Sequence, residues 1–240
     1  MGIVHKVYTL LGGKEGSFLQ TKWSNYCIGK DLKRKQKLLR QYGIEALQAF
    51  KEICRESSVG YWLEFGTLLG AVRHKSFIPH DFDLDVGILE DSYTEDFEKK
   101  LIAKGFVKDH SFDVVKVPTG ERKPSEYAFH YKGLAFDIFL GIREGDTRTV
   151  YCYEVEKGDI VSSTRSYTFS TKEPLSTVTI NGVELSAPAD PVKTLSMYYG
   201  EDFMTPNPNW TGKNGGNKCA TYYTPNEITG ILIRPKTDVL

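Results

Sequence analysis

Two aspartates separated by a single residue, Asp83 and Asp85, are the side chains in this sequence best suited to do chemistry. The segment Asp83–Ile88 has the apolar pattern of a short strand, in which alternate side chains share a face. Both carboxylates then point the same way, with Cα atoms about 7 Å apart. Two carboxylates held so close repel each other unless a cation lies between them, and oxygen-only ligation favours Mg²⁺ or Mn²⁺. The alternative interpretation is a solvated acidic end of a strand.

Two further carboxylates extend this pattern. Asp81 has the same parity as Asp83 and Asp85, at or before the start of the strand. Asp137 is the single acid in the apolar run Leu134–Leu140, which also has the character of a strand. Burying an unpaired carboxylate costs several kcal/mol, so we expect Asp137 to share a metal with Asp83 and Asp85. A salt bridge to a neighbouring Arg or Lys is the alternative.

Gly66 and Thr67 lie where a strand is expected to turn into a helix. Such a turn offers backbone N–H groups and a helix N-terminus, which together suit a phosphate. Arg73, farther along the same helix, is a candidate phosphate clamp because a guanidinium can bind phosphate through two parallel hydrogen bonds. A structural ion pair between Arg73 and Glu64 is the alternative. A glycine–threonine turn followed by two alternating aspartates on the next strand is the layout of the nucleotidyltransferase superfamily.

The segment Tyr61–Ile88 resembles the signature of the LicD family, which includes the fukutin-related proteins. The residues that match the family pattern are Trp62, Leu63, Glu64, Gly66, Thr67, Leu68, Leu69, Gly70, Ala71, Arg73, His74, Ile78, Pro79, Asp81, Asp83 and Asp85. Asp137-Ile138 resembles the family's downstream acidic motif, and residues 187–206 resemble its closing helix, so the likeness spans about 44–210. The chain departs from the pattern at His80, where the family has Trp, and at Phe82, and it has no counterpart of a zinc-binding Cys/His insertion.

The resemblance implies transfer of a phosphorylated alcohol from a CDP-linked donor to a hydroxyl of a cell-surface glycan. Phosphocholine, ribitol phosphate and glycerol phosphate are the candidate groups, and capsule, teichoic acid and lipopolysaccharide are the candidate acceptors. The expected catalytic and metal-binding residues are Asp83, Asp85 and Asp137, with Mg²⁺ or Mn²⁺. The expected substrate-binding residues are Gly66, Thr67, Arg73, Asp81 and Glu64. Two alternatives are a nucleotidyltransferase that moves NMP from an NTP, and an inactive interaction module with the same fold.

The elements that must position these residues indicate an α+β fold, nucleotidyltransferase-like, with a mixed sheet flanked by helices. Helices are expected over Asp31–Ser57 and Leu68–His74, from a Ser92/Glu95 capping box to about Lys104, and from Asp190-Pro191 to Gly200. Strands are expected over Tyr61–Phe65, Asp83–Ile88, Phe106–Lys108, Val114–Val117, Glu126–Tyr131 and Leu134–Leu140. Asn181-Gly182 predicts a hairpin within Thr177–Leu185. Tyr61–Phe65, Asp83–Ile88 and Leu134–Leu140 should be neighbours.

Composition narrows the class of protein. The 240 residues carry 31 basic and 31 acidic side chains, so no global charge favours nucleic acid. Residues 1–240 are expected to form one domain whose tail, 201–240, is irregular and carries Trp210 and Tyr222-Tyr223. The four cysteines, of which no two have metal-ligand spacing, are expected as free thiols: Cys27, Cys54, Cys152 and Cys219. Without a signal peptide or a transmembrane segment, we expect a cytoplasmic protein, with room for peripheral membrane association.

Overall fold

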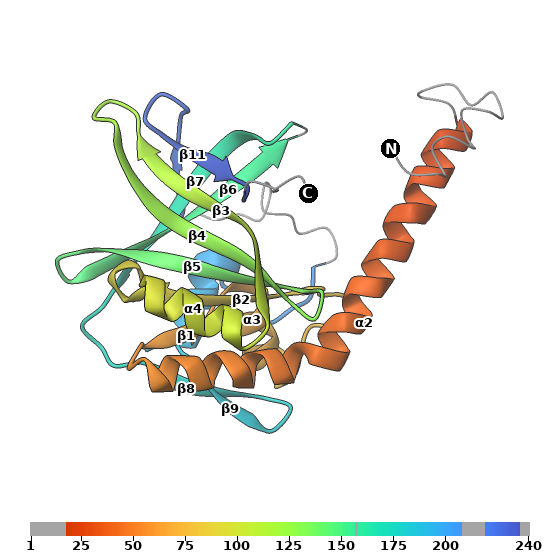
Figure 1. The fold of residues 1–240 in the computed structure, drawn as a ribbon, viewed down its shortest axis with the longest axis horizontal. Helices are drawn as coiled ribbons and strands as arrows, with labels where there is room; N and C mark the ends of the chain where they lie inside the picture. The colour runs from red at the N-terminus through yellow and green to blue at the C-terminus, as the bar shows by residue number, and fades with distance from the viewer. Residues whose placement is uncertain (1–17, 157, 208–218, 236–240) are drawn as a thin grey trace.

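The computed structural model describes residues 18–156, 158–207 and 219–235, with the backbone alone over 18–28. Figure 1 shows helices gathered around a large twisted sheet, with the N-terminal half of α2 extending away from it. The helices are α2 (Phe18–Glu56), α3 (Phe65–His74), the 3₁₀ turn η1 (Glu90–Ser92), α4 (Glu95–Ala103) and α5 (Pro191–Tyr199). The strands are β1 (Tyr61–Leu63), β2 (Asp83–Leu89), β3 (Phe106–Lys116), β4 (Glu121–Tyr131), β5 (Leu134–Glu144), β6 (Thr147–Glu156), β7 (Ile160–Ser170), β8 (Ser176–Ile180), β9 (Val183–Ala187), β10 (Thr221–Tyr223) and β11 (Ile228–Ile233).

The main sheet has nine strands and branches at β5. One path runs β10-β7-β6-β5-β4-β3-β11 with antiparallel neighbours, while β2 pairs with β5 in parallel and with β1 antiparallel. The sheet is therefore mixed, and β8 and β9 form a separate hairpin. The parallel register sets Asp85 beside Asp137 and Val86 beside Ile138.

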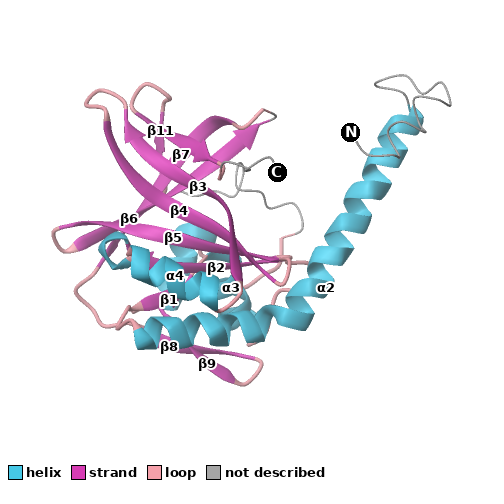
Figure 2. Ribbon diagram, viewed as in Figure 1, coloured by secondary structure: helices cyan, strands magenta, loops and turns pink. Residues whose placement is uncertain are grey.

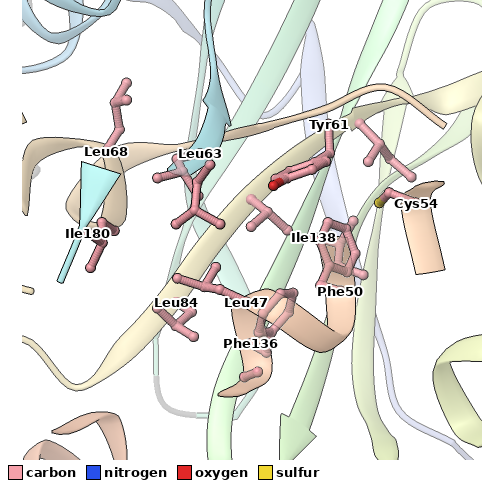
Figure 3. Close-up of a cluster of buried hydrophobic side chains, with 14 of the residues drawn as sticks. Leu47, Phe50, Cys54, Tyr61, Leu63, Leu68, Leu84, Phe136, Ile138 and Ile180 are labelled. Atoms are coloured by element: carbon pink, nitrogen blue, oxygen red, sulfur yellow. The ribbon is translucent and has the colours of Figure 1, made fainter. Parts of the chain in front are cut away.

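Successive side chains of β2 and β5 point alternately to the two faces of the sheet. Leu84, Val86, Phe136 and Ile138 are fully buried on one face, where the Phe50 ring of α2 lies 5.1 Å from that of Phe136. Figure 3 shows this cluster, and Figure 2 shows α2 and α4 lying over the same side of the strands. The acidic residues of β2 and β5 have the other parity and face the opposite side.

Several expectations from the sequence are confirmed. The fold is α+β with a mixed sheet, and β1, β2 and β5 are neighbours. Asn181 and Gly182, both with positive φ, turn the chain between β8 and β9, as a type I′ hairpin requires. Asp190 caps α5 by accepting a hydrogen bond from the Lys193 backbone N–H at 2.9 Å.

Other boundaries were wrong. Helix α2 begins at Phe18 rather than Asp31. Strand β1 ends at Leu63 instead of Phe65, so α3 begins at Phe65 and includes Gly66-Thr67 in its first turn. The capping box at Ser92 is absent, because Ser92 lies in η1 and Thr94 caps α4 through the Phe97 backbone N–H.

The second half of the chain contains more strand than expected. Strands β3 and β4 are each eleven residues long, and β6 and β7 were not predicted. Their polar residues interrupt the alternation that would signal a strand from sequence alone. The tail is not wholly irregular, since β10 pairs with β7 and β11 pairs with β3. Trp210 lies outside the described residues.

Candidate active site

Three aspartates converge on one face of the sheet. Asp83 and Asp85 come from β2 and Asp137 from β5, and each offers a carboxylate oxygen within 4.8 Å of the others. We call these residues the acidic trio. Within the described residues it is the one group of three or more Asp, Glu, His or Cys side chains arranged closely enough to hold a metal ion. The structure thus brings together the three residues expected to bind metal.

The acidic trio is electrostatically unfavourable when all its members are ionised. Burial and the neighbouring charge of Asp81 raise the pKa of Asp83 to about 8. Burial, followed by the charges of Asp83 and Asp137, raises the pKa of Asp85 well above its ordinary value. Burial and the charges of Glu126 and Asp83 do the same to the pKa of Asp137. A divalent cation supplies the opposite charge that such a set lacks, so the residues present fit Mg²⁺ or Mn²⁺.

Two acidic residues adjoin the trio. Asp81 precedes β2 and accepts a hydrogen bond from the Phe82 backbone N–H, and burial raises its pKa. Glu126 of β4 is 9% exposed, and burial raises the pKa of its side chain to about 8. Sequence analysis missed Glu126. Glu126 lies on the acidic face because it shares its parity on β4 with Ala128, which pairs with Asp137, and this pairing is not evident from the sequence.

The turn into α3 lies against the trio. A Cβ atom built on Gly66 would meet Asp81 Oδ2 at 2.7 Å, so a side chain at this position would require the Asp81 carboxylate or the turn to shift, whereas its 3.5 Å distance to Asp85 Oδ2 is an ordinary contact. Thr67 is buried, and its hydroxyl accepts a hydrogen bond from the Asp85 backbone N–H at 2.8 Å. The Thr67 hydroxyl therefore fastens the first turn of α3 to β2.

Phe65, the first residue of α3, has a φ of 35°. A bulky non-glycine residue at positive φ costs on the order of 1–3 kcal/mol and persists only where its surroundings hold it. Its ring packs on Phe139 at 4.8 Å and on Tyr198 of α5 at 4.5 Å. The strain therefore lies directly beside the turn that faces the acidic trio.

A cavity of about 410 Å³ adjoins this turn. Three of the expected substrate-binding residues line it, Gly66, Arg73 and Asp81, together with His80 and side chains of the 199–207 segment. Arg73 donates from Nη1 to the Phe203 carbonyl oxygen at 3.2 Å and from Nε to His74. The structure thus contains no ion pair between Arg73 and Glu64 among its described residues.

Glu64 lies elsewhere, fully buried and away from the cavity lining. It accepts hydrogen bonds from Trp62 Nε1 and, at 2.7 Å, from the Tyr198 hydroxyl. Arg148 Nη1 lies 3.4 Å from Glu64 Oε1. Burial raises the pKa of Glu64, and the positive charge of Arg148 opposes that rise. The sequence suggested that Glu64 binds substrate, but its side chain is not accessible from the cavity.

Polar and basic residues of α2 adjoin the loop that leads into β2, a contact that the sequence did not predict. Gln36 and Arg40 donate to the carbonyl oxygens of His80 and Pro79. Lys35 Nζ lies 5.6 Å from the centre of the Phe82 ring, and its charge partly offsets the raised pKa of Asp83. A cation on α2 therefore stands beside the acidic end of β2.

The other residues that the sequence singled out, the aromatic residues and the cysteines, differ in burial. Tyr61 and Trp62 are buried, as expected of core residues, whereas Tyr222 is 54% exposed. Cys54, Cys152 and Cys219 are free thiols, and the side chain of Cys27 lies outside the described residues. Among the described helices, none combines the length and the apolar character needed to cross a membrane.

Comparison with known proteins gives the family. A family model described as LicD/FKTN/FKRP, nucleotidyltransferase domain, matches residues 58–190, more than half of the chain. An uncharacterized protein of Rickettsia typhi is 25% identical over 88% of this chain and 59% of its own length. The human ribitol 5-phosphate transferase FKRP is 36% identical over 35% of this chain and 15% of its own length.

The lipopolysaccharide cholinephosphotransferase LicD of Haemophilus influenzae is 44% identical over 21% of this chain and 19% of its own length. The matched part is less than two thirds of the length of each of these relatives. The family match includes β1, the turn into α3 and all three aspartates of the acidic trio. The chain therefore belongs to the LicD/FKTN/FKRP nucleotidyltransferase-domain family.

Proposed function

We propose that this chain transfers a phosphorylated alcohol from a CDP-linked donor to a hydroxyl of a cell-surface glycan, with Mg²⁺ or Mn²⁺ held by Asp83, Asp85 and Asp137. The observation that carries the proposal is the acidic trio, whose carboxylate oxygens lie within 4.8 Å on two paired strands. The named relatives act as cholinephosphate and ribitol 5-phosphate transferases, which supports a phosphoalcohol as the transferred group. A nucleotidyltransferase-like fold is part of the same proposal.

The chemistry is a substitution at phosphorus. The acceptor oxygen forms a bond to the phosphorus that carries the alcohol, and the bond from that phosphorus to the bridging oxygen breaks. CMP leaves with the electron pair. A bound divalent cation would neutralise the charge on the donor phosphates and on the leaving CMP.

The residues of the chain supply the remaining functions. Asp137, or one of Asp83 and Asp85, would take the proton of the acceptor hydroxyl, because a carboxylate within hydrogen-bond reach of that hydroxyl can act as a general base. The N-terminal turn of α3, which contains Gly66 and Thr67, would offer backbone N–H groups to a phosphate. Arg73, which lines the cavity with Asp81, and Lys35, whose charge acts on Asp83, provide positive charge near the acidic residues. We propose that His80, which lines the cavity, influences which alcohol is accepted, together with Phe82 two residues later in the chain.

The test is a donor panel. CDP-choline, CDP-ribitol, CDP-glycerol, CDP-ethanolamine and the NTPs are each mixed with the chain and Mg²⁺, and thermal shifts are recorded. A ligand that binds only the folded chain raises its stability with concentration. The donors that bind are then incubated with glycan acceptors, and ³¹P NMR follows the products. The proposal predicts CMP release from a CDP-alcohol that EDTA stops.

Asp137→Ala should lower turnover by about 10³-fold or more, as loss of a metal ligand that also accepts a proton would. Release of pyrophosphate from an NTP, with no CMP from any CDP-alcohol, would instead assign the chain to the nucleotidyltransferases that move NMP.

A further inference from the structure

A fully buried polar cluster lies next to the turn that faces the acidic trio. It consists of Trp62, Glu64, Arg148 and Tyr198, which we call the Glu64 network. Glu64 is its centre, accepting from Trp62 Nε1 and from the Tyr198 hydroxyl, with Arg148 Nη1 at 3.4 Å. The Arg148 guanidinium lies between two rings, 4.0 Å from Trp62 and 4.6 Å from Phe169.

The Glu64 network rests on the same face of the sheet as the acidic trio. Gly87 follows Asp85 by two residues on β2 and therefore shares its face. A Cβ built on Gly87 would collide with the Trp62 indole, and one built on Gly141 of β5 would meet both Arg148 and Trp62 at about 3.4 Å. Trp62 and Arg148 thus cover the stretch of β2 and β5 immediately beyond the aspartates.

The Glu64 network also contacts the strained first residue of α3. Tyr198 hydrogen-bonds Glu64 and packs its ring on Phe65, the next residue, whose φ is 35°. The Glu64 backbone N–H donates to the Asp85 carbonyl oxygen at 3.0 Å, and the Asp85 N–H donates to Thr67 at 2.8 Å. Two hydrogen bonds therefore connect residues 64–67 directly to Asp85 on β2.

We propose that the Glu64 network is a positioning device that holds the strained Phe65–Gly66–Thr67 turn at a fixed distance from the acidic trio. Glu64, Arg148 and Tyr198 are then positioning residues rather than substrate ligands. The part of this inference that concerns turnover rests on the proposed function, because it assumes that Gly66-Thr67 receives the donor phosphate.

A role limited to stability fits the cluster poorly. A buried ion pair is often replaceable by apolar side chains of similar size without loss of stability, because the attraction between the charges is offset by their lost hydration. Backbone strain beside a functional turn is instead a sign of preorganisation. Changes to the Glu64 network should therefore lower turnover without a matching loss of stability.

Two changes test this separation. Tyr198→Phe removes the hydroxyl that donates to Glu64 and keeps the ring on Phe65. The double change Glu64→Met with Arg148→Met removes both charges together and keeps apolar volume. The matched control is Tyr153→Phe, which removes a hydroxyl bonded to Ser125 at 2.6 Å on β4, away from α3.

Three quantities are measured for each variant, in addition to its Tm. The first is the hydrogen-exchange rate of the Asp85 backbone amide in metal-free protein, which reports on the Thr67 contact. The second is Mn²⁺ affinity, which reports on the acidic trio alone. The third is kcat/KM for the CDP-alcohol that the wild-type chain uses in the donor panel.

The proposal predicts Asp85 amide exchange faster by about tenfold than in the wild type, without a matching change in the slowest-exchanging core amides. It predicts kcat/KM lower by about tenfold to 10²-fold, Mn²⁺ affinity within about twofold, and little change in Tm. Tyr153→Phe should leave all four quantities near their wild-type values.

The proposal is overturned if the network variants keep wild-type Asp85 exchange and kcat/KM, or if every core amide and the Tm change together, which would show a purely structural role. Should the wild-type chain use no CDP-alcohol, the proposed function fails. Asp85 exchange in the metal-free variants would still decide whether the network holds the turn.

Discussion

At the scale of single residues, the acidic trio is a set of groups that the folded chain holds at an electrostatic cost. Asp83, Asp85 and Asp137 are each buried enough, and near enough to other acids, for their pKa values to be raised. Structural carboxylates usually have cationic partners that lower the pKa, as Lys104 does for Glu52. Groups that destabilise the empty fold are instead typical of sites that bind a ligand of opposite charge.

Replacing one member of the trio tests this view. Asp85→Asn should abolish turnover and leave the Tm of the metal-free chain unchanged or raised, because a repelling charge is removed from a partly buried position. Differential scanning calorimetry in EDTA measures the Tm. A large fall in Tm would show that Asp85 belongs to a structural network.

The pH dependence of stability gives a second residue-scale prediction. The pKa of Asp83 is raised from about 4 in the unfolded chain to about 8 in the folded chain. Between these values the folded chain binds more protons than the unfolded chain, so its free energy of unfolding falls as pH rises. Above the folded pKa this loss is complete.

Urea denaturation in EDTA should therefore show wild type losing stability relative to Asp83→Asn between about pH 5 and about pH 9, by at least about 1 kcal/mol. Saturating Mg²⁺ should reverse the loss, since a cation favours the ionised carboxylates. A wild-type chain that gains stability relative to the variant over this range would contradict the raised pKa.

At the scale of elements, the turn from β1 into α3 brings the substrate-binding candidates to the trio. The sequence predicted its components and the neighbouring strands β1, β2 and β5, because a glycine, a short apolar run and alternating acids are local signals. It placed the start of α3 three residues too late, at Leu68 instead of Phe65. Phe65, whose φ is positive, packs its ring on Tyr198 and Phe139, which lie far away in sequence.

Gly66→Ala tests the close approach of this turn. The added Cβ would meet Asp81 Oδ2 at 2.7 Å, so the turn and the carboxylate must move apart. A displacement of about 1 Å near a reacting centre can lower turnover by about 10²-fold, and we expect a loss of that order in kcat/KM for the CDP-alcohol.

Gly60→Ala is the matched control, since its Cβ would meet only Leu175 at an ordinary 3.7 Å. Gly60→Ala should keep wild-type kcat/KM. Equal activity in both variants would show that the space at Gly66 is not needed for the reaction.

At the scale of the whole molecule, contacts between distant segments complete the site, and these were the least predictable features. Glu64 was expected to contact substrate, but Arg148 of β6 and Tyr198 of α5 enclose it. Neither partner was predicted, because only the tertiary fold brings Arg148 of β6 and the face of α5 that carries Tyr198 against Glu64. Glu126 was missed for the same reason, since its nearness to Asp137 depends on the pairing of β4 with β5.

The tail shows the same limit. Pro, Gly and Asn after residue 200 favour irregular chain, yet β10 and β11 add to the two ends of the main sheet. Such short strands form because an existing strand edge offers unpaired backbone groups to a segment with little preference of its own. The sequence therefore predicts the centre of the sheet, and the long-range pairing determines its edges.

The central claim, that the acidic trio holds a divalent cation against a nucleotide-linked donor, is tested most directly by Mn²⁺ titration followed by electron paramagnetic resonance. The titration is done with and without each CDP-alcohol, on wild type, Asp85→Asn and Asp137→Asn. Two ligands that share a site and favour each other must each raise the affinity of the other.

The account predicts one Mn²⁺ site in the wild type whose affinity rises when a CDP-alcohol is present, and loss of that site in both variants. Mn²⁺ binding that persists in Asp85→Asn and Asp137→Asn, or that no CDP-alcohol strengthens, would contradict it.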